Sequence, residues 1–139
     1  MIKILSLALE SVATKVDLFN AISNLITPLD NDIADSLLKR EKIVSTGVGL
    51  GIAIPHTVSE YVNEPTLVFI RLNEAMEFDA IDEKLVDLVF AIFVPKGEEE
   101  KHLPILSRLA GLLLDSDLVL EFRQKDLDYL VNILKEGLN

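Results

Sequence analysis

The sequence predicts a three-layer α/β domain in which a mixed central β-sheet is covered by helices on both faces. Two apolar runs, residues 66–72 (TLVFIRL) and 86–94 (VDLVFAIFV), are rich in β-branched and aromatic residues, as sheet strands are. The second run stays apolar from Leu88 onward, which is typical of a central strand buried on both faces. Segments with helical periodicity precede and follow the two runs, so helices are available for both layers.

Length and charge narrow the class of protein. The 139 residues are predicted to form a single domain, residues 1–139. The 13 Lys and Arg against 23 Asp and Glu give a net charge of −10, which disfavours nucleic acid and anionic membranes as partners. No apolar stretch has the length of a transmembrane helix, so we expect no membrane insertion. The absence of cysteine excludes disulfides, a thiolate nucleophile and Cys-ligated zinc.

The N-terminal segment is predicted to be an edge strand. Residues 1–9 contain a short apolar run that Glu10 ends, and no small-residue cleavage pattern follows it. We therefore expect a cytoplasmic protein.

Two helices are expected next. Apolar residues recur at helical spacing over Lys15–Ile26, with Thr14 placed as N-cap and Pro28 preventing continuation. Residues 31–43 are predicted as the second helix, because Asn31 can cap it, acidic residues lie at its start and basic residues at its end.

A glycine-rich segment follows, STGVGLG at residues 45–51, and it is predicted to be a loop. It lacks the Gly-Lys-Ser/Thr of a nucleotide-binding loop, and it precedes a strand rather than joining a strand to a helix. Residues 52–54 read as a short buried strand that Pro55 ends, which places His56 at the end of a strand.

The last third of the chain is predicted to be helical. The acidic residues 98–100 favour the start of a helix whose apolar face carries His102. Residues 117–138 are predicted to form one or two further amphipathic helices.

The two histidines of the chain, His56 and His102, are the main candidates for functional residues. By position alone, His56 is either a loop imidazole satisfied by backbone groups or a functional residue, and His102 is either a core histidine or its partner. Ligands of α/β folds bind beyond the ends of strands, where these two side chains could meet. A neutral imidazole can accept a phosphoryl group near pH 7 without a metal. Arg40 could then contribute paired donors to phosphate oxygens, its alternative being the solvated end of a helix.

Other candidate sites are weaker. Asp79 and Asp82 could bind a metal, but a turn is favoured because the chain has two histidines and no cysteine. Ser45, Thr46 and Ser107 have no neighbouring base in the sequence, so a serine hydrolase is not supported.

One long string of residues resembles a known family. REK at residues 40–42 followed by STGVGLGIAIPH resembles the active-site signature of the type-2 (fructose/mannitol-like) enzyme IIA family of the phosphoenolpyruvate-dependent phosphotransferase system. Residues 78–95 (FDAIDEKLVDLVFAIFVP) and 102–110 (HLPILSRLA) match the family's later blocks in the expected order. The similarity covers nearly the whole chain, is strongest over residues 38–115, and is greatest to the nitrogen-regulatory branch.

The resemblance implies a fold with a mixed central sheet and a cytoplasmic phosphocarrier. In it, His56 accepts a phosphoryl group reversibly from a histidine-containing phosphocarrier protein, and His102 and Arg40 assist as catalytic residues. Thr57 and Gly51 are expected in the environment of the phosphoryl group. No cofactor, metal or nucleotide is expected to be required.

Two features concern the surroundings of the site. The family usually has Gly after the active histidine, whereas this chain has Thr57, whose β-branched side chain resists a positive φ and whose hydroxyl could donate to phosphate. Glu41, Glu60 and Glu64 are expected to form an acidic rim that orients a basic face of the carrier protein.

Three alternatives remain open. The chain could be a binding module that regulates a target protein and uses phosphorylation only as its switch, as the nitrogen-regulatory resemblance suggests. It could pass the phosphoryl group to a separate permease subunit during sugar transport. It could also be a degenerate domain that no longer accepts phosphate, for which Thr57 is the one hint, although the presence of Arg40, His56 and His102 argues against it.

Overall fold

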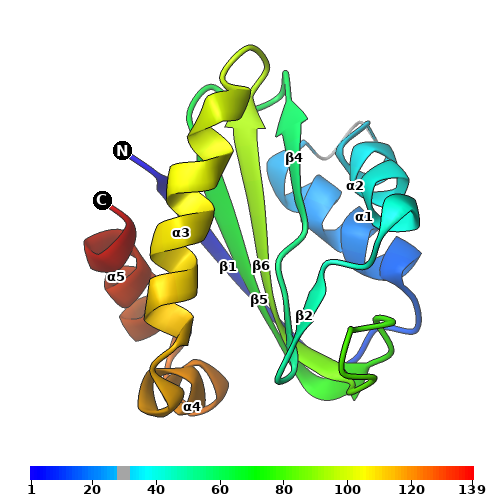
Figure 1. The fold of residues 1–139 in the computed structure, drawn as a ribbon, viewed down its shortest axis with the longest axis vertical. Helices are drawn as coiled ribbons and strands as arrows, with labels where there is room; N and C mark the ends of the chain where they lie inside the picture. The colour runs from blue at the N-terminus through cyan, green and yellow to red at the C-terminus, as the bar shows by residue number, and fades with distance from the viewer. Residues whose placement is uncertain (28–31) are drawn as a thin grey trace.

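A mixed six-stranded sheet lies at the centre of the computed structural model, which describes residues 1–27 and 32–139 (Figure 1). Its strands are β1 (Lys3–Leu9), β2 (Gly47–Gly49), β3 (Ile52–Ala53), β4 (His56–Ser59), β5 (Thr66–Met76) and β6 (Val86–Pro95). The order is β1-β5-β6-β3-β2, and β4 also pairs with β6. β1 is parallel to β5 and both β3 and β4 are parallel to β6, whereas β5 and β6 are antiparallel, as are β2 and β3. The predicted mixed sheet and the N-terminal edge strand are confirmed.

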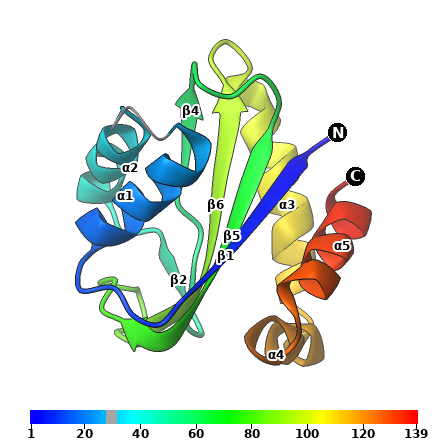
Figure 2. The same cartoon turned by 180° about the vertical axis from the view of Figure 1, so that it is seen from behind.

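Helices cover both faces of this sheet, which confirms the three layers (Figures 1 and 2). On one face lie α1 (Lys15–Ile26) and α2 (Asp32–Ile43). On the other lie α3 (His102–Leu113), α4 (Ser116–Gln124) and α5 (Leu127–Leu138), with a 3-10 turn at Glu99–Lys101 leading into α3. The acidic residues 98–100, predicted to start the helix, belong to this 3-10 turn and its cap, and α3 itself begins at His102. Residues 117–138 form two helices.

Two hydrophobic clusters fill the spaces between the layers. Alternate residues of β5 point to opposite faces: Val68 and Ile70 pack with α1 and α2, and Leu67 and Phe69 pack with α3 to α5. β6 is buried without interruption from Leu88 to its end, as the sequence predicted for a central strand. None of the helices within the described ranges is both long and apolar enough to cross a lipid bilayer.

The helix boundaries follow local signals where the structure describes them. Thr14 caps α1, and its side chain accepts a hydrogen bond from the backbone N–H of Asp17. The predicted roles of Pro28 and Asn31 lie outside the described residues. β5 is longer than predicted, because its last residues are exposed and carry no apolar pattern before Met76.

The glycine-rich segment differs from its prediction. Gly47–Gly49 forms the short strand β2 and pairs with β3, so the segment is a tight hairpin rather than a loop. Its turn uses positive φ at Gly49, Leu50 and Gly51. The alternating glycines concealed the strand, because they carry no side chain that could show the period of two.

His56 also differs from its prediction, because it begins a strand instead of following one. Pro55 has no N–H and interrupts the pairing after β3, as expected. Its carbonyl still accepts a hydrogen bond from Ile92 N–H (2.9 Å), so the chain stays beside β6. Pairing resumes at once as β4, with His56 opposite Ile92.

Candidate active site

The two histidines meet over the edge of the sheet, as the sequence analysis expected. His56 is the first residue of β4 and His102 the first of α3. Their ring centroids lie 5.4 Å apart with the planes at 72°, an edge-to-face contact. Both side chains are half-buried, so each is supported by protein on one side and open to solvent on the other.

The backbone holds the His56 ring in one tautomer. Nδ1 of His56 lies 2.9 Å from the carbonyl oxygen of Ile54. A carbonyl oxygen only accepts hydrogen bonds, so Nδ1 carries the hydrogen and the neutral ring keeps its lone pair on Nε2. Nε2 is therefore the ring nitrogen whose lone pair is available in this tautomer.

The backbone holds His102 in the other tautomer, with its hydrogen on Nε2. Its Nε2 donates to the carbonyl oxygen of Thr57 at 3.2 Å, which leaves Nδ1 without a hydrogen in the neutral ring. Burial lowers the pKa of His102 below its usual value, and the positive charge of a protonated His56 lowers this pKa further. The hydrogen bond to Thr57 and the charge of Glu99 oppose this shift without reversing it. His102 is therefore neutral at pH 7.

Thr57 has ordinary strand geometry. It lies in β4 opposite Phe93, so the chain needs no positive φ where the family usually has glycine. Its hydroxyl donates to the carbonyl oxygen of Val58 over 3.4 Å, close to the longest distance for a hydrogen bond. The conflict between a β-branched side chain and a left-handed backbone therefore does not arise.

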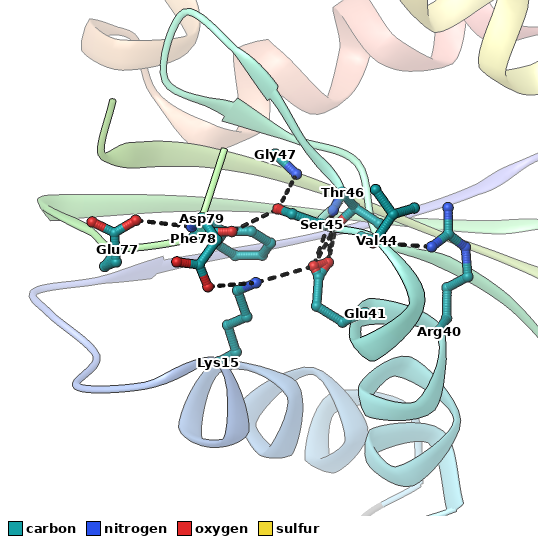
Figure 3. Close-up of polar contacts among 10 residues, drawn as sticks. All are labelled: Lys15, Arg40, Glu41, Val44, Ser45, Thr46, Gly47, Glu77, Phe78 and Asp79. Atoms are coloured by element: carbon teal, nitrogen blue, oxygen red, sulfur yellow. Dashed lines mark hydrogen bonds and ion pairs between the residues drawn. The ribbon is translucent and has the colours of Figure 1, made fainter. Parts of the chain in front are cut away.

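Arg40 is half-buried in the last turn of α2. Its Nη1 donates to the carbonyl oxygen of Val44 at 3.1 Å, as Figure 3 shows. Among the described residues, this hydrogen bond ties the guanidinium to the segment entering β2 rather than to either histidine. It occupies one of five guanidinium donors.

Gly51 lies away from the histidine pair, in contrast to its expected place around the phosphoryl group. Its carbonyl oxygen accepts from Asp87 and Leu88 N–H, whereas His56 pairs with Ile92. The four residue steps from Leu88 to Ile92 span about 13 Å of an extended strand. The turn of the hairpin therefore lies near α4, where Arg123 donates a hydrogen bond to the carbonyl oxygen of Leu50.

Glu41 does not belong to an acidic rim, because it is only 8% exposed. Its carboxylate accepts from the backbone and side chain of Thr46, and it forms an ion pair with Lys15 (Figure 3). Glu60 and Glu64 are exposed. The sequence did contain a signal: Glu41 continues the buried face of α2, four residues after Leu37.

Asp79 and Asp82 lie in the connection from β5 to β6 and confirm the predicted turn. Asp79 has a positive φ and pairs with Lys15, while Asp82 accepts from the backbone N–H of Leu50 and Lys84. These backbone hydrogen bonds, that from Leu50 first, lower the pKa of Asp82. Within the described ranges, no three His, Asp or Glu side chains gather closely enough to hold a metal ion.

The fold and the paired histidines can be compared with known families. A family model described as the phosphoenolpyruvate-dependent sugar phosphotransferase system, EIIA 2, matches residues 4–137. The chain belongs to this family, in agreement with the resemblance found in its sequence.

The relatives include fructose-specific EIIA components and nitrogen regulatory proteins. The chain is 47% identical over 89 residues to the PTS system fructose-specific EIIA component of Haloferax volcanii, covering 63% of this chain and 58% of the relative. It is 42% identical over 100 residues to the nitrogen regulatory protein of Escherichia coli, covering 69% of this chain and 60% of the relative. The chain thus spans about 60% of the length of these curated relatives.

Solved structures agree on the fold. The nitrogen regulatory protein IIA-Ntr of Neisseria meningitidis superposes with a TM-score of 0.80 at 33% identity, covering 96% of this chain and 92% of the other. IIA mannitol from Escherichia coli gives a TM-score of 0.72 at 22% identity, covering 95% of each chain, which shows a shared fold.

Proposed function

We propose that this chain is a cytoplasmic phosphocarrier of the phosphoenolpyruvate-dependent phosphotransferase system, with a histidine-containing phosphocarrier protein as its donor. The observation that carries the proposal is the hydrogen bond from His56 Nδ1–H to Ile54 O, which leaves the Nε2 lone pair available beside His102. The family supports the reaction type, because its printed description names this phosphotransferase system.

The transfer needs little covalent work from the protein. His56 Nε2 forms a bond to phosphorus while the N–P bond to the donor imidazole breaks, and that electron pair returns to the donor nitrogen. No proton has to leave Nε2, because the tautomer already carries its hydrogen on Nδ1. Catalysis then consists of placement and stabilisation of the phosphoryl charge.

Arg40 and His102 are proposed to stabilise that charge. Arg40 uses one donor on Val44 O and has others for phosphoryl oxygens, which a guanidinium binds well. His102 is neutral before transfer, and its free Nδ1 can take up a proton when a phosphoryl group adds negative charge next to it.

Thr57 is proposed to donate its hydroxyl to the phosphoryl group, because its contact with Val58 O is long and easily exchanged. Thr57→Gly should then slow phosphorylation and shorten the lifetime of phosphohistidine. An unchanged or faster rate together with an unchanged or longer lifetime would remove Thr57 from the mechanism.

The decisive experiment is the intact mass after incubation with phosphoenolpyruvate, the general phosphotransferase enzyme and its phosphocarrier. Wild type is expected to gain one acid-labile phosphoryl group, and His56→Ala none. A chelator should not affect this step. If wild type stays unmodified by donors shown to be active, the phosphocarrier proposal fails.

A second candidate is a regulatory module that binds its target according to its phosphorylation state. The likeness to IIA-Ntr of Neisseria meningitidis favours it, and the likeness to a fructose-specific EIIA component favours a relay to a permease subunit. His56→Ala and His56→Asp separate the two. A relay loses function in both variants, whereas a switch follows the charge and differs between them.

A further inference from the structure

We infer that Glu41 is a positioning residue that fixes the ring of His56 through two intervening backbone residues. The inference rests on the proposed function only for its effect on phosphoryl transfer. The positioning itself is a property of the unphosphorylated protein.

The first link is the buried anchor between Glu41 and Thr46 (Figure 3). The Thr46 N–H donates to both carboxylate oxygens, at 2.8 and 3.0 Å, and its hydroxyl donates to Oε1 at 2.6 Å. Lys15 Nζ lies 3.4 Å from Oε2 and pairs with the same carboxylate. Since Thr46 is only 5% exposed, water has little access to replace Glu41 in these contacts.

The second link joins Thr46 to Ile54. The Thr46 carbonyl oxygen accepts a hydrogen bond from Ile54 N–H at 2.9 Å. Ile54 lies in the gap between β3 and β4, just before Pro55, where pairing with β6 is interrupted. Its peptide therefore depends on Thr46 for a contact that a regular strand would take from its neighbour.

The third link is the hydrogen bond from His56 Nδ1–H to Ile54 O, at 2.9 Å. Thr46 thus holds the N–H of Ile54, while the carbonyl of the same residue holds the imidazole. If the anchor on Thr46 is lost, Ile54 can shift and the ring loses its fixed acceptor. A free imidazole populates both neutral tautomers, and only the Nδ1–H form presents its lone pair on Nε2.

These links explain why a carboxylate stands at position 41. The group must accept from two Thr46 donors and from Lys15 at once, and a carboxylate only accepts. Glu41→Gln keeps the shape of the side chain and one accepting oxygen. Its NH₂ group would face Thr46 and Lys15, which are themselves donors, so one acceptor is lost. It should weaken the anchor without removing it.

The test compares tautomers by the ¹⁵N NMR shifts of the imidazole nitrogens at about pH 8, where an ordinary histidine is neutral. The central variant combines Lys15→Met with Glu41→Leu, because exchanging a buried ion pair for apolar side chains often preserves stability. Glu41→Gln is the conservative second variant. Arg123→Ala is the matched control, because it releases the other end of the same hairpin by removing a hydrogen bond to Leu50 O.

We expect wild type and Arg123→Ala to show His56 as the Nδ1–H tautomer. The double variant should show a mixture of tautomers and transfer phosphoryl on the order of 10- to 100-fold more slowly, the size of loss that misplacement of a reacting group causes. Glu41→Gln should lie between them. Intermediate behaviour of Glu41→Gln also supports the inference if the double variant does not fold.

A folded double variant with the wild-type tautomer and rate would overturn the inference, as would a Glu41→Gln variant indistinguishable from wild type when the double variant is unfolded. Failure of the proposed function is separate. If wild type accepts no phosphoryl group, the NMR comparison still shows whether Glu41 sets the tautomer of His56.

Discussion

Two sets of polar contacts, the base clamp and the tip clamp, hold the two ends of the β2–β3 hairpin, and they differ in how deeply they are buried. At its base, Glu41 binds Thr46 with a carboxylate whose side chain is 5% exposed. At its tip, Arg123 binds both oxygens of Asp87 and the carbonyl of Leu50, with side-chain exposures of 32% for Arg123 and 26% for Asp87.

Burial decides how much each clamp contributes. Water can replace a half-exposed partner, so loss of the tip clamp lowers the free energy of unfolding only a little. The buried donors at the base have no water to bind when Glu41 is removed. The buried clamp also lies at the end of the hairpin that continues to Ile54 and His56. The buried contact, which water cannot easily replace, is thus the one linked through Ile54 to His56.

The largest expected effect comes from breaking the base clamp. Glu41→Ala should lower the free energy of unfolding by about 3 kcal/mol, because it leaves Lys15 and the donors of Thr46 without their buried acceptor. Urea denaturation measures the loss. Glu10→Ala, which removes an exposed acceptor of Asn73, is the control and should cost about 0.5 kcal/mol or less. Equal losses in the two variants would contradict the role of burial.

The elements of the fold were predictable where side chains repeat with a period. The central strand β6 and the helix Lys15–Ile26 follow directly from apolar spacing and a cap. Strand β2 was missed because glycines carry no pattern, and the start of β4 at His56 was missed because Pro55 usually ends pairing. A carbonyl that still accepts from Ile92 keeps the chain in place, and such a contact cannot be read from the sequence.

The meeting of the two histidines was predictable from the sequence, but the contacts that hold them in place were not. Residue types identified His56 and His102, and the topology brings them together. Gly51 was expected beside them from the family resemblance, but the extended chain between Gly51 and His56 carries it away. Glu41 was expected in an acidic rim that meets a basic face of the carrier protein, but its partners Thr46 and Lys15 hold it in the interior.

The tip of the hairpin can be tested through its backbone. Gly51 has a φ of +81°, and an added Cβ would lie 2.6 Å from Arg123 Nη2, so the guanidinium would have to move. Gly51→Ala should cost about 2 kcal/mol, part of it from the left-handed backbone. Gly97→Ala is a matched control, because Gly97 has a φ of +91° with nothing within 4 Å. A loss no larger than that of Gly97→Ala would show that the clamp contributes nothing.

The tip clamp itself should be worth less. Arg123→Ala is expected to lower the free energy of unfolding by about 1 kcal/mol, since the pair with Asp87 is bidentate but partly exposed. The difference from wild type should shrink at high salt, where exposed charges are screened. Urea denaturation at low and high salt measures both effects, and a loss as large as that of Glu41→Ala would contradict the ranking of the two clamps.

The smallest expected effect concerns the titration of His102. Its pKa lies below the usual value, first because of burial and then because of His56, so His56→Ala should raise this pKa only part of the way back. The unfolded chain, with an ordinary histidine, binds a proton at a higher pH than the folded one does. Stability is therefore fully present above about pH 6.5 and declines as the pH falls below it. NMR titration of the ring protons in both proteins measures the shift. An unchanged pKa in His56→Ala would mean that burial alone sets it, and that the two rings do not interact electrostatically.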